Sequence, residues 1–374
     1  MNKSKSILII SSEFPPGPGG IGHHAYNLAK QFHRRGYPLL VYSNADYAEP
    51  TEVAEFDSTQ AFPIIRFKRY GRLTPFHRLS KILRICRKKR PDTIILTGRF
   101  SIWVIFFLRL FRIRARYLSI IHGHEPIFGS TLAQYFTNYC ISKSDVVIPV
   151  SGFSANNIPI RFRQESKVQT IPNGIDVSYL ESWNNTDLSI QLDGDPVLLT
   201  VGHTSPRKGQ HRVIKALPLL KKKYPEITYH IVGRDVNNHK LEQLAKQLGV
   251  TKQVYFHEQV RVHQNLFNYY HAADVFMLLS ENQWNGDVEG FGIVALEANY
   301  FGVPVIGAKY CGVEDAVKEK ISGCLVDGNS SEEIADALCY IMKNRAKMSE
   351  YARRWAIEHN WDTIGARFEA VLKL

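Results

Sequence analysis

The sequence of 374 residues lacks the features that mark secreted, membrane-spanning or disordered proteins. Its five cysteines include no CxxC pair, which argues against a disulfide scaffold and a structural zinc site and favours a reducing cytosol. No run of about 20 uncharged apolar residues is present, so we expect no membrane-spanning helix. The short apolar run at 6–12 predicts a first strand rather than a signal peptide.

Acidic residues are almost absent from one long segment. Residues 66–116 carry 16 Lys and Arg against Asp92 alone, a net charge of +15, whereas the whole chain carries +12. Five apolar side chains interleave with these cations: Phe76, Leu79, Ile82, Leu83 and Ile85. Because this pattern suits an anionic leaflet, we predict a cytoplasmic protein that lies on the inner face of the membrane through 66–116. A solvated basic helix is the alternative, and no recognised motif supports a nucleic-acid partner.

Apolar, β-branched runs alternate with amphipathic helical patterns, which predicts βαβ units with parallel strands. The strands are expected at 6–12, 38–43, 93–98, 117–123, 145–151, 197–203, 227–233, 253–260, 275–280, 303–308 and 324–328. The stretch from about Ala346 to Leu374 has a helical pattern without a further strand. We therefore predict an α/β chain of two doubly wound, Rossmann-like domains, at 1–180 and 190–357, with a last helix at about 358–374. Ligands of such folds bind beyond the carboxyl ends of the strands.

A loop rich in proline and glycine follows the first strand. Gly17, Gly19 and Gly22 satisfy the GxGxxG fingerprint, and Asp46 lies 24 residues after Gly22. Prolines at 15, 16 and 18, and a gap of about four residues after the strand, do not suit the tight turn of an NAD site. Three interpretations stay open: a plain loop, a loop that meets a phosphate with its N–H groups, and an NAD site.

Arg207 and Lys208 lie between the strand at 197–203 and the helix that follows it. Cations at the N-terminus of a helix oppose the helix dipole, so a purely structural reason for them is hard to find. An anion between the cations and the dipole removes the conflict. The segment therefore predicts phosphate binding, with a solvated loop as the alternative.

Two glutamates eight residues apart, Glu289 and Glu297, flank a glycine pair after the strand at 275–280. Glycines permit the close approach of a backbone to a ligand. The neighbours of Glu297 are apolar, so exposure to solvent does not explain it. The alternative is a helix whose terminal carboxylates face its dipole.

His122, His124 and Glu125 end the strand at 117–123. Two histidines and a carboxylate at a strand end favour an active-site role over a structural one. No HxxxH or further ligand cluster supports zinc there, and we predict no metal site. The DxD sequence at Asp193 and Asp195 precedes a strand, so we interpret it as a turn rather than a metal-diphosphate site.

Together these segments resemble the family-four retaining glycosyltransferases of GT-B architecture. The matching pieces are GGIGHH, IHGHE, IPNGID, PRKG, EGFGIVALEA with its E-x7-E spacing, and FGVPVIGA, which span nearly the whole chain in the family's order. The resemblance implies that the C-terminal domain holds a nucleotide sugar and the N-terminal domain faces the acceptor. It also implies that the final helix crosses back onto the first domain.

The resemblance also implies individual roles. Glu297 would bind the ribose hydroxyls, and Glu289 would face the transferred sugar. Lys208 would neutralise the diphosphate, which Gly20 would touch from the other domain. His122 would lie beside the reactive centre, with His124 and Glu125 nearby. The cleft would be lined by Asn173, and the backbone amides on the sugar or distal phosphate would be those of Phe291, Gly292 and Ile293.

Two segments depart from the family pattern. His203 stands where the family usually has Arg, with Arg207 as the expected substitute, and the segment 232–235 lacks the family's usual second glycine. Our interpretation is a metal-independent, retaining hexosyltransferase that moves a hexose from a UDP- or GDP-sugar to a glycan or lipid-linked acceptor. The rivals are a nucleotide-sugar epimerase or hydrolase, an inactive nucleotide-sugar sensor and an NAD-dependent dehydrogenase.

Overall fold

A computed structural model describes residues 5–17, 19–46, 48–68, 70–164, 167–182, 190–234, 238–257 and 263–373. The chain divides into two compact units, with Met1–Asn173 and Trp361–Leu374 in unit 1 and Gly174–Asn360 in unit 2. Positions considered above that fall outside the described residues are Pro18, Arg69, residues 183–189 around the predicted domain boundary, and the end of the predicted strand 253–260.

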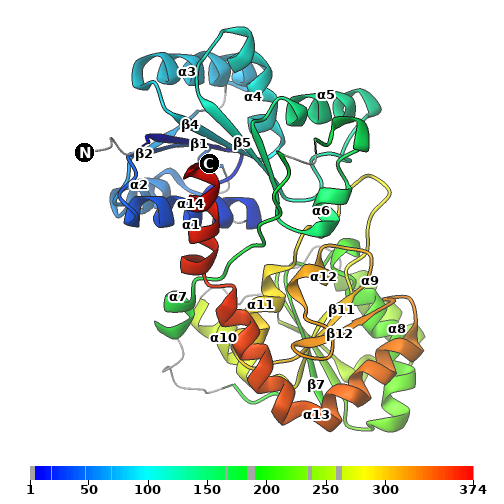
Figure 1. Cartoon of the computed structure of the whole chain (residues 1–374). Coiled ribbons are helices and arrows are strands. Elements are labelled where there is room, and N and C mark those ends of the chain that lie inside the picture. Colours follow the sequence, from blue (N-terminus) through cyan, green and yellow to red (C-terminus); the bar gives the residue numbers. More distant parts are fainter. Residues whose placement is uncertain are drawn as a thin grey trace. The chain divides into compact units, whose positions relative to one another are not determined.

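Unit 1 contains a parallel sheet in the order β3-β2-β1-β4-β5-β6 (Figure 1). Its strands are β1 (Ile7–Ser11), β2 (Leu39–Ser43), β3 (Ile64–Arg66), β4 (Thr93–Thr97), β5 (Arg116–Ile121) and β6 (Val146–Pro149). Its helices are α1 (Gly20–Arg34), α2 (Pro50–Ser58), α3 (Thr74–Lys89), α4 (Arg99–Leu110), α5 (Thr131–Ser142), α6 (Gly152–Asn156) and α14 (Trp361–Lys373), with 3₁₀ turns at Gly71–Leu73 and Ile160–Phe162.

The strands of unit 1 are apolar runs because helices cover both faces of the sheet. Helices α3, α4 and α5 lie along one face, where Ile82, Ile105 and Ile141 join a core with Leu8 and Leu96. Helices α1 and α14 pack against each other on the opposite face (Figure 1).

Helix α14 returns to unit 1 although it ends the chain. Gln31 of α1 donates a hydrogen bond to the Asp362 carboxylate at 2.9 Å, and Arg116 donates to the Val371 carbonyl at 2.7 Å. A side chain at Gly365 would press on Gln31, so glycine allows the two helices to approach closely. The predicted return of the last helix to the first domain is confirmed.

Unit 2 contains a parallel sheet in the order β12-β11-β10-β7-β8-β9. Its strands are β7 (Val197–Val201), β8 (Thr228–Val232), β9 (Val254–His257), β10 (Val275–Leu278), β11 (Val305–Ala308) and β12 (Gly323–Val326). Its helices are α7 (Val177–Ser182), α8 (Gln210–Lys223), α9 (Asn238–Gln247), α10 (His263–Ala272), α11 (Ile293–Tyr300), α12 (Val313–Ala316) and α13 (Ser331–Glu358), with 3₁₀ turns at Pro206–Lys208 and Thr251–Gln253.

The predicted α/β fold with two doubly wound sheets is confirmed. One detail differs from the sequence-based expectation, because the edge strand β3 was not predicted. The last helix, α14, begins at Trp361, close to its predicted start at about residue 358, and His359 and Asn360 separate it from α13. Within the described ranges, every helix is too short or too polar to cross a bilayer.

Candidate functional site

The candidate donor site lies at the carboxyl edge of the unit 2 sheet. Strand β7 pairs with β10, so the loops that leave these two strands are neighbours. The loop after β7 brings Arg207 and Lys208, and the loop after β10 brings Glu289. The Glu289 carboxylate accepts from Arg207 Nη1 at 2.5 Å and from Lys208 Nζ at 2.8 Å, and Arg207 Nε lies 3.1 Å from Asp287.

These two cations set the charge of Glu289. Burial would raise the pKa of the carboxyl group, but Lys208 and Arg207 outweigh burial through charge and hydrogen bonds and lower the pKa to about 2. Glu289 is therefore ionised throughout the physiological range. It can stabilise a positive charge but cannot act as a general acid.

The loop after β7 differs from the sequence-based expectation in one respect. Arg207 and Lys208 do not open helix α8, because they form the 3₁₀ turn Pro206–Lys208 and α8 begins at Gln210. Gly209 joins the two with a positive φ of 73°, and a side chain there would collide with the Leu279 carbonyl. In the structure, the anion that faces the two cations is Glu289.

Glu297 lies one turn into helix α11, whose N-terminus follows the backbone amides of Phe291 and Gly292. Gly292 has φ 89°, a conformation that favours glycine. Tyr270 of α10 is fully buried and donates its hydroxyl to Glu297 Oε2 at 3.0 Å. Burial raises the pKa of Glu297, and the Tyr270 hydrogen bond and the Lys208 charge oppose this rise.

Tyr270 predicts a pH effect on donor binding. The Tyr270→Phe variant lacks the hydroxyl that donates to Glu297. The pKa of Glu297 should therefore rise further, since only the Lys208 charge then opposes the effect of burial on this pKa. If the ionised carboxylate holds the ribose, the pH below which GDP binding weakens should move upward, as measured by calorimetry. Glu297→Ala should remove this transition and weaken binding by about 1.5–3 kcal/mol.

Tyr269→Phe is the matched control for Tyr270→Phe. Its hydroxyl is hydrogen-bonded to His257 Nδ1 at 3.1 Å rather than to Glu297. The control should keep the wild-type transition, and an unchanged transition in Tyr270→Phe would contradict the assignment of Glu297.

The unit 1 cluster lies at the carboxyl ends of the neighbouring strands β4 and β5. His122 Nε2 is 2.8 Å from Thr97 Oγ1, and the buried Glu125 carboxylate accepts from the N–H groups of His122 and Gly123. His124 Nδ1 lies 3.9 Å from Glu125. The structure thus brings the three predicted residues of IHGHE together, with Glu125 holding the backbone of the turn.

His122 is neutral at physiological pH. Burial lowers its pKa to about 3, although Glu125 opposes the shift. The ring of His24 lies edge-on to it, with 5.1 Å between ring centroids, and burial lowers the pKa of His24 to about 3 as well. A neutral imidazole can donate a hydrogen bond to a sugar hydroxyl or accept one from it, but it does not supply a positive charge.

The Pro/Gly loop between β1 and α1 spans residues 12–19, which is longer than the tight turn of a dinucleotide fingerprint. Gly20 is the first residue of α1, is exposed, and has open space where a side chain would lie. Within this loop, burial raises the pKa of Glu13.

Asn173 and the DxD sequence complete the positions considered in the sequence. Asn173 is buried, and its Oδ1 has no hydrogen-bond partner in the part of the chain that is described. The carbonyl of Asp193 accepts from Thr228 Oγ1 at 2.6 Å. No group of three or more His, Cys, Asp or Glu residues suited to a metal ion occurs among the described residues.

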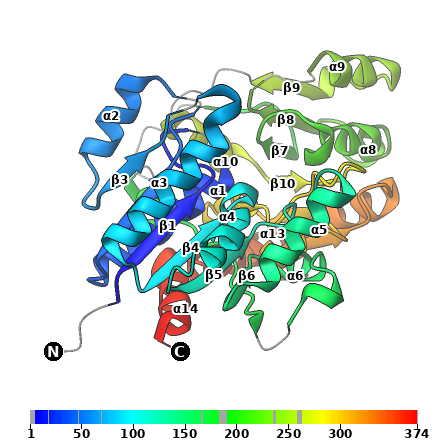
Figure 2. The same ribbon diagram turned by 90° about the horizontal axis from the view of Figure 1, so that it is seen from above.

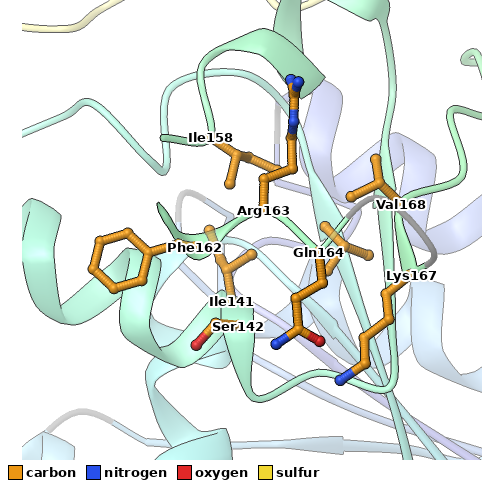
Figure 3. A pocket seen from close by; sticks show the side chains of 9 residues that line it. Ile141, Ser142, Ile158, Phe162, Arg163, Gln164, Lys167 and Val168 are labelled. Carbon is orange, nitrogen blue, oxygen red and sulfur yellow. The ribbon is translucent and has the colours of Figure 1, made fainter. Parts of the chain in front are cut away.

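A small pocket lies elsewhere in unit 1 (Figure 3). Its volume of about 10 Å³ suits a single water molecule rather than a nucleotide sugar. No predicted site residue lines it; its lining comprises Ile141, Ser142, Val147, Ile158, Phe162, Arg163, Gln164, Lys167 and Val168.

Sequence reasoning missed Tyr270, Thr97 and Asp287 as parts of these clusters. Tyr270 lies beside other aromatic residues that indicate a core helix, and Thr97 lies inside the predicted buried strand 93–98. A search for polar side chains at strand ends would have found Thr97, whereas Asp287 lies nine residues after the end of β10 at Leu278. Tyr270 had no comparable signal in the sequence.

Two family models match the chain in succession. A model of glycosyltransferase family 4 matches residues 18–179, and a model of glycosyl transferases group 1 matches residues 187–355. Between them they cover most of the chain.

Relatives and solved structures agree with these matches. A GDP-mannose-dependent alpha-(1-6)-phosphatidylinositol monomannoside mannosyltransferase of Mycolicibacterium smegmatis is 26% identical over 98% of each chain. A D-inositol 3-phosphate glycosyltransferase of Corynebacterium urealyticum is 35% identical over 43% of this chain and 39% of its own. The crystal structure of HepE from Anabaena in complex with UDP has a TM-score of 0.77 and 20% identity over 98% of this chain and 99% of its own.

These matches favour a glycosyltransferase over an NAD-dependent dehydrogenase. They confirm the predicted glycosyltransferase with a nucleotide-sugar donor, and the structural likeness confirms the GT-B fold. The chain belongs to the family-4 glycosyltransferases.

Proposed function

We propose that this glycosyltransferase moves a hexose from a GDP- or UDP-sugar to a lipid-linked acceptor and retains the anomeric configuration. The observation that carries the proposal is the ionised Glu289 held between Arg207 and Lys208 at the carboxyl edge of the unit 2 sheet. The whole-length relatives are GDP-mannose-dependent, so GDP-mannose is the first donor to test.

The unit 2 residues fit the charges of this reaction. When the bond between sugar and diphosphate breaks, negative charge develops on the leaving diphosphate and positive charge on the sugar ring. Arg207 and Lys208 would stabilise the leaving group, together with the amides before α11. Glu289 would stabilise the ring, and Glu297 would orient the ribose.

His122 completes the proposed machinery as a neutral hydrogen-bonding group. Thr97 fixes one ring nitrogen, which leaves the other for a hydroxyl of the transferred sugar. Because the pKa of His122 lies near 3, we assign it to orientation of the sugar rather than to proton donation.

The direct test supplies GDP-mannose and a panel of UDP-sugars with a lipid extract as acceptor. The expected result is a glycolipid whose new linkage has the anomeric configuration of the donor, as determined by NMR. EDTA should leave the rate unchanged, since the two cations stand in for a metal ion. Inverted product would refute retention, donor hydrolysis without transfer would favour the hydrolase, and binding without turnover would favour the sensor.

The proposal places the protein at an anionic membrane surface through residues 66–116. Several cations of this segment have structural partners instead. Arg66 pairs with Asp57 and Arg109 with Asp145, both at 2.7 Å. Arg78 is buried between two aromatic rings, each 3.8 Å away.

Many other cations of the segment remain exposed. They are Lys68, Arg72, Arg84, Arg87, Lys88, Lys89, Arg90, Arg112 and Arg114. Each basic residue near an anionic surface contributes about 1 kcal/mol. The protein should therefore sediment with liposomes of anionic lipid, less so in high salt, and not with neutral liposomes. Equal recovery in the supernatant for both liposome types at low salt would count decisively against this contact.

His203 predicts a pH-dependent donor affinity. Burial lowers the pKa of its imidazole, and so do the neighbouring cations Arg207, Lys208 and Arg234. A bound diphosphate should raise this pKa again. Affinity should then increase as pH falls from the bound-state pKa to the free-state pKa, by up to about tenfold for each unit between them. In His203→Arg the donor affinity measured by calorimetry should not change over this pH range. The same pH dependence in both proteins would show that His203 does not contact the phosphates.

Gly20 predicts a loss of activity without a loss of stability. A methyl group at Gly20 meets open space, so Gly20→Ala should keep or slightly raise the melting temperature. If a diphosphate approaches the backbone there, a displacement of about 1 Å should lower transfer by up to about 100-fold. Gly36→Ala is the steric control, because it also meets open space, although its positive φ of 79° adds strain. Unchanged transfer in Gly20→Ala would remove Gly20 from the donor site.

A further inference from the structure

A groove on the surface of unit 1 runs between helix α3 and the end of helix α4, which lie next to each other in Figure 2. Its volume is about 590 Å³, within the range of ligand sites. It is lined by Phe76, Leu79, Ser80, Leu83, Arg84, Arg87, Lys88 and Phe111.

One wall of the groove is a single stripe of α3. Its residues recur at helical spacing from Phe76 to Lys88, so they share one face. The first half of the stripe is apolar, with Phe76, Leu79 and Leu83, and the second half ends in cations. The stripe spans about 18 Å at about 1.5 Å per residue, which gives the groove an apolar end and a cationic end.

The apolar end is exposed to an unusual degree. Phe76 is 72% exposed, and Phe111, on the opposite wall, is 46% exposed. Large aromatic side chains grouped on a surface mark a binding site for an apolar group. The Arg87 guanidinium lies over the Phe111 ring at 5.8 Å, where it joins the cationic end to the second wall.

Among the described residues, the cations of the groove form no ion pair with a carboxylate. These cations are Arg84, Arg87 and Lys88, whereas Arg66 and Arg109 of the same segment do form ion pairs. Cations in the last turn of a helix favour its dipole, which accounts in part for Arg87 and Lys88. The dipole explains neither Arg84, which lies before that turn, nor the exposed aromatic rings.

We propose that this groove binds one anionic phospholipid, with an acyl chain along the apolar end and the phosphate at Arg84, Arg87 and Lys88. The inference rests on the proposed membrane contact and makes it more specific. Adsorption by charge alone needs no apolar groove, whereas a seated lipid needs both ends of it.

The test measures binding of dihexanoyl-phosphatidylglycerol, below its micelle concentration, to the full-length protein by NMR titration. Dihexanoyl-phosphatidylcholine and glycerol 3-phosphate serve as the probes that lack the net charge and the acyl chains, respectively. We expect the anionic lipid to bind at least about tenfold more tightly than either. The proposal would be wrong if glycerol 3-phosphate bound as tightly as the anionic lipid, or if the neutral lipid did.

Two groove variants and two matched controls complete the test. Phe76→Ser and Arg84→Glu should each weaken binding of the short-chain anionic lipid at least about tenfold. Leu73→Ser and Arg114→Glu change residues that are also exposed but do not line the groove, and they should bind normally. If all four variants bind alike, the proposal is wrong.

Liposome sedimentation separates this proposal from the membrane contact on which it rests. If wild type sediments with anionic liposomes but does not bind the short-chain lipid, the groove is refuted and the membrane contact stands. If wild type does neither, both fail. Binding of GDP should be unchanged in Phe76→Ser and Arg84→Glu, which verifies that each variant is folded.

Discussion

The Glu289→Gln enzyme should lose about 10²- to 10³-fold in kcat, because it lacks the negative charge proposed to stabilise the sugar ring in the transition state. Its affinity for GDP should be kept or increased. In the wild type the diphosphate must compete with Glu289 for Arg207 and Lys208, which hold the carboxylate at 2.5 and 2.8 Å. The measurements are single-turnover rates and calorimetry with GDP.

Thermal unfolding provides the control for Glu289→Gln. Removing one partner of a largely buried ion pair costs up to about 3–5 kcal/mol, so the variant should melt at a lower temperature. GDP should raise its melting temperature by more than it raises that of the wild type, because the diphosphate replaces the lost anion. Transfer at the wild-type rate would remove Glu289 from catalysis, and loss of GDP binding would assign it to the donor contact instead.

Lys208→Ala should weaken GDP binding by about 1.5–3 kcal/mol, which is roughly 10- to 150-fold in Kd. Guanosine should bind as well as it does to the wild type, because the ammonium group is proposed to meet only the phosphates. The difference between the two ligands is the quantity to measure, since a general distortion of the loop would affect both.

Lys215→Ala is the matched control for Lys208→Ala. Lys215 is an exposed lysine on α8 and makes no contact with Glu289. It should bind both ligands normally. Equal weakening of guanosine and GDP in Lys208→Ala would show that Lys208 does not lie on the phosphates.

The predicted strands were recovered because parallel strands covered by helices on both faces are continuous apolar runs. Strand β3, Ile64–Arg66, escaped prediction because it has three half-buried residues at the edge of the sheet. The last helix was predicted from about residue 358, near the start of α14 at Trp361, although His359 and Asn360 are neither the proline nor the glycine that usually ends a helix.

The site was less accessible to prediction than the fold. The loops that follow the predicted strands indicated that Lys208, Glu289 and His122 lie at the carboxyl edges of the sheets, since neighbouring parallel strands bring their loops together. The sequence could not show that Glu289 faces Lys208, because about 80 residues separate them and the pairing depends on β7 lying beside β10. The neutral state of His122 likewise depends on burial, which a motif does not encode.

The return of α14 to unit 1 has a consequence for synthesis on the ribosome. Unit 2 is continuous in sequence, whereas unit 1 is split between the two ends of the chain. Helix α14 covers His24 through Trp361 and Phe368, so a nascent unit 1 exposes that patch until the last residues emerge. Unit 2 can therefore complete its fold first, and a chain truncated before Trp361 should expose the patch to chaperones and proteases.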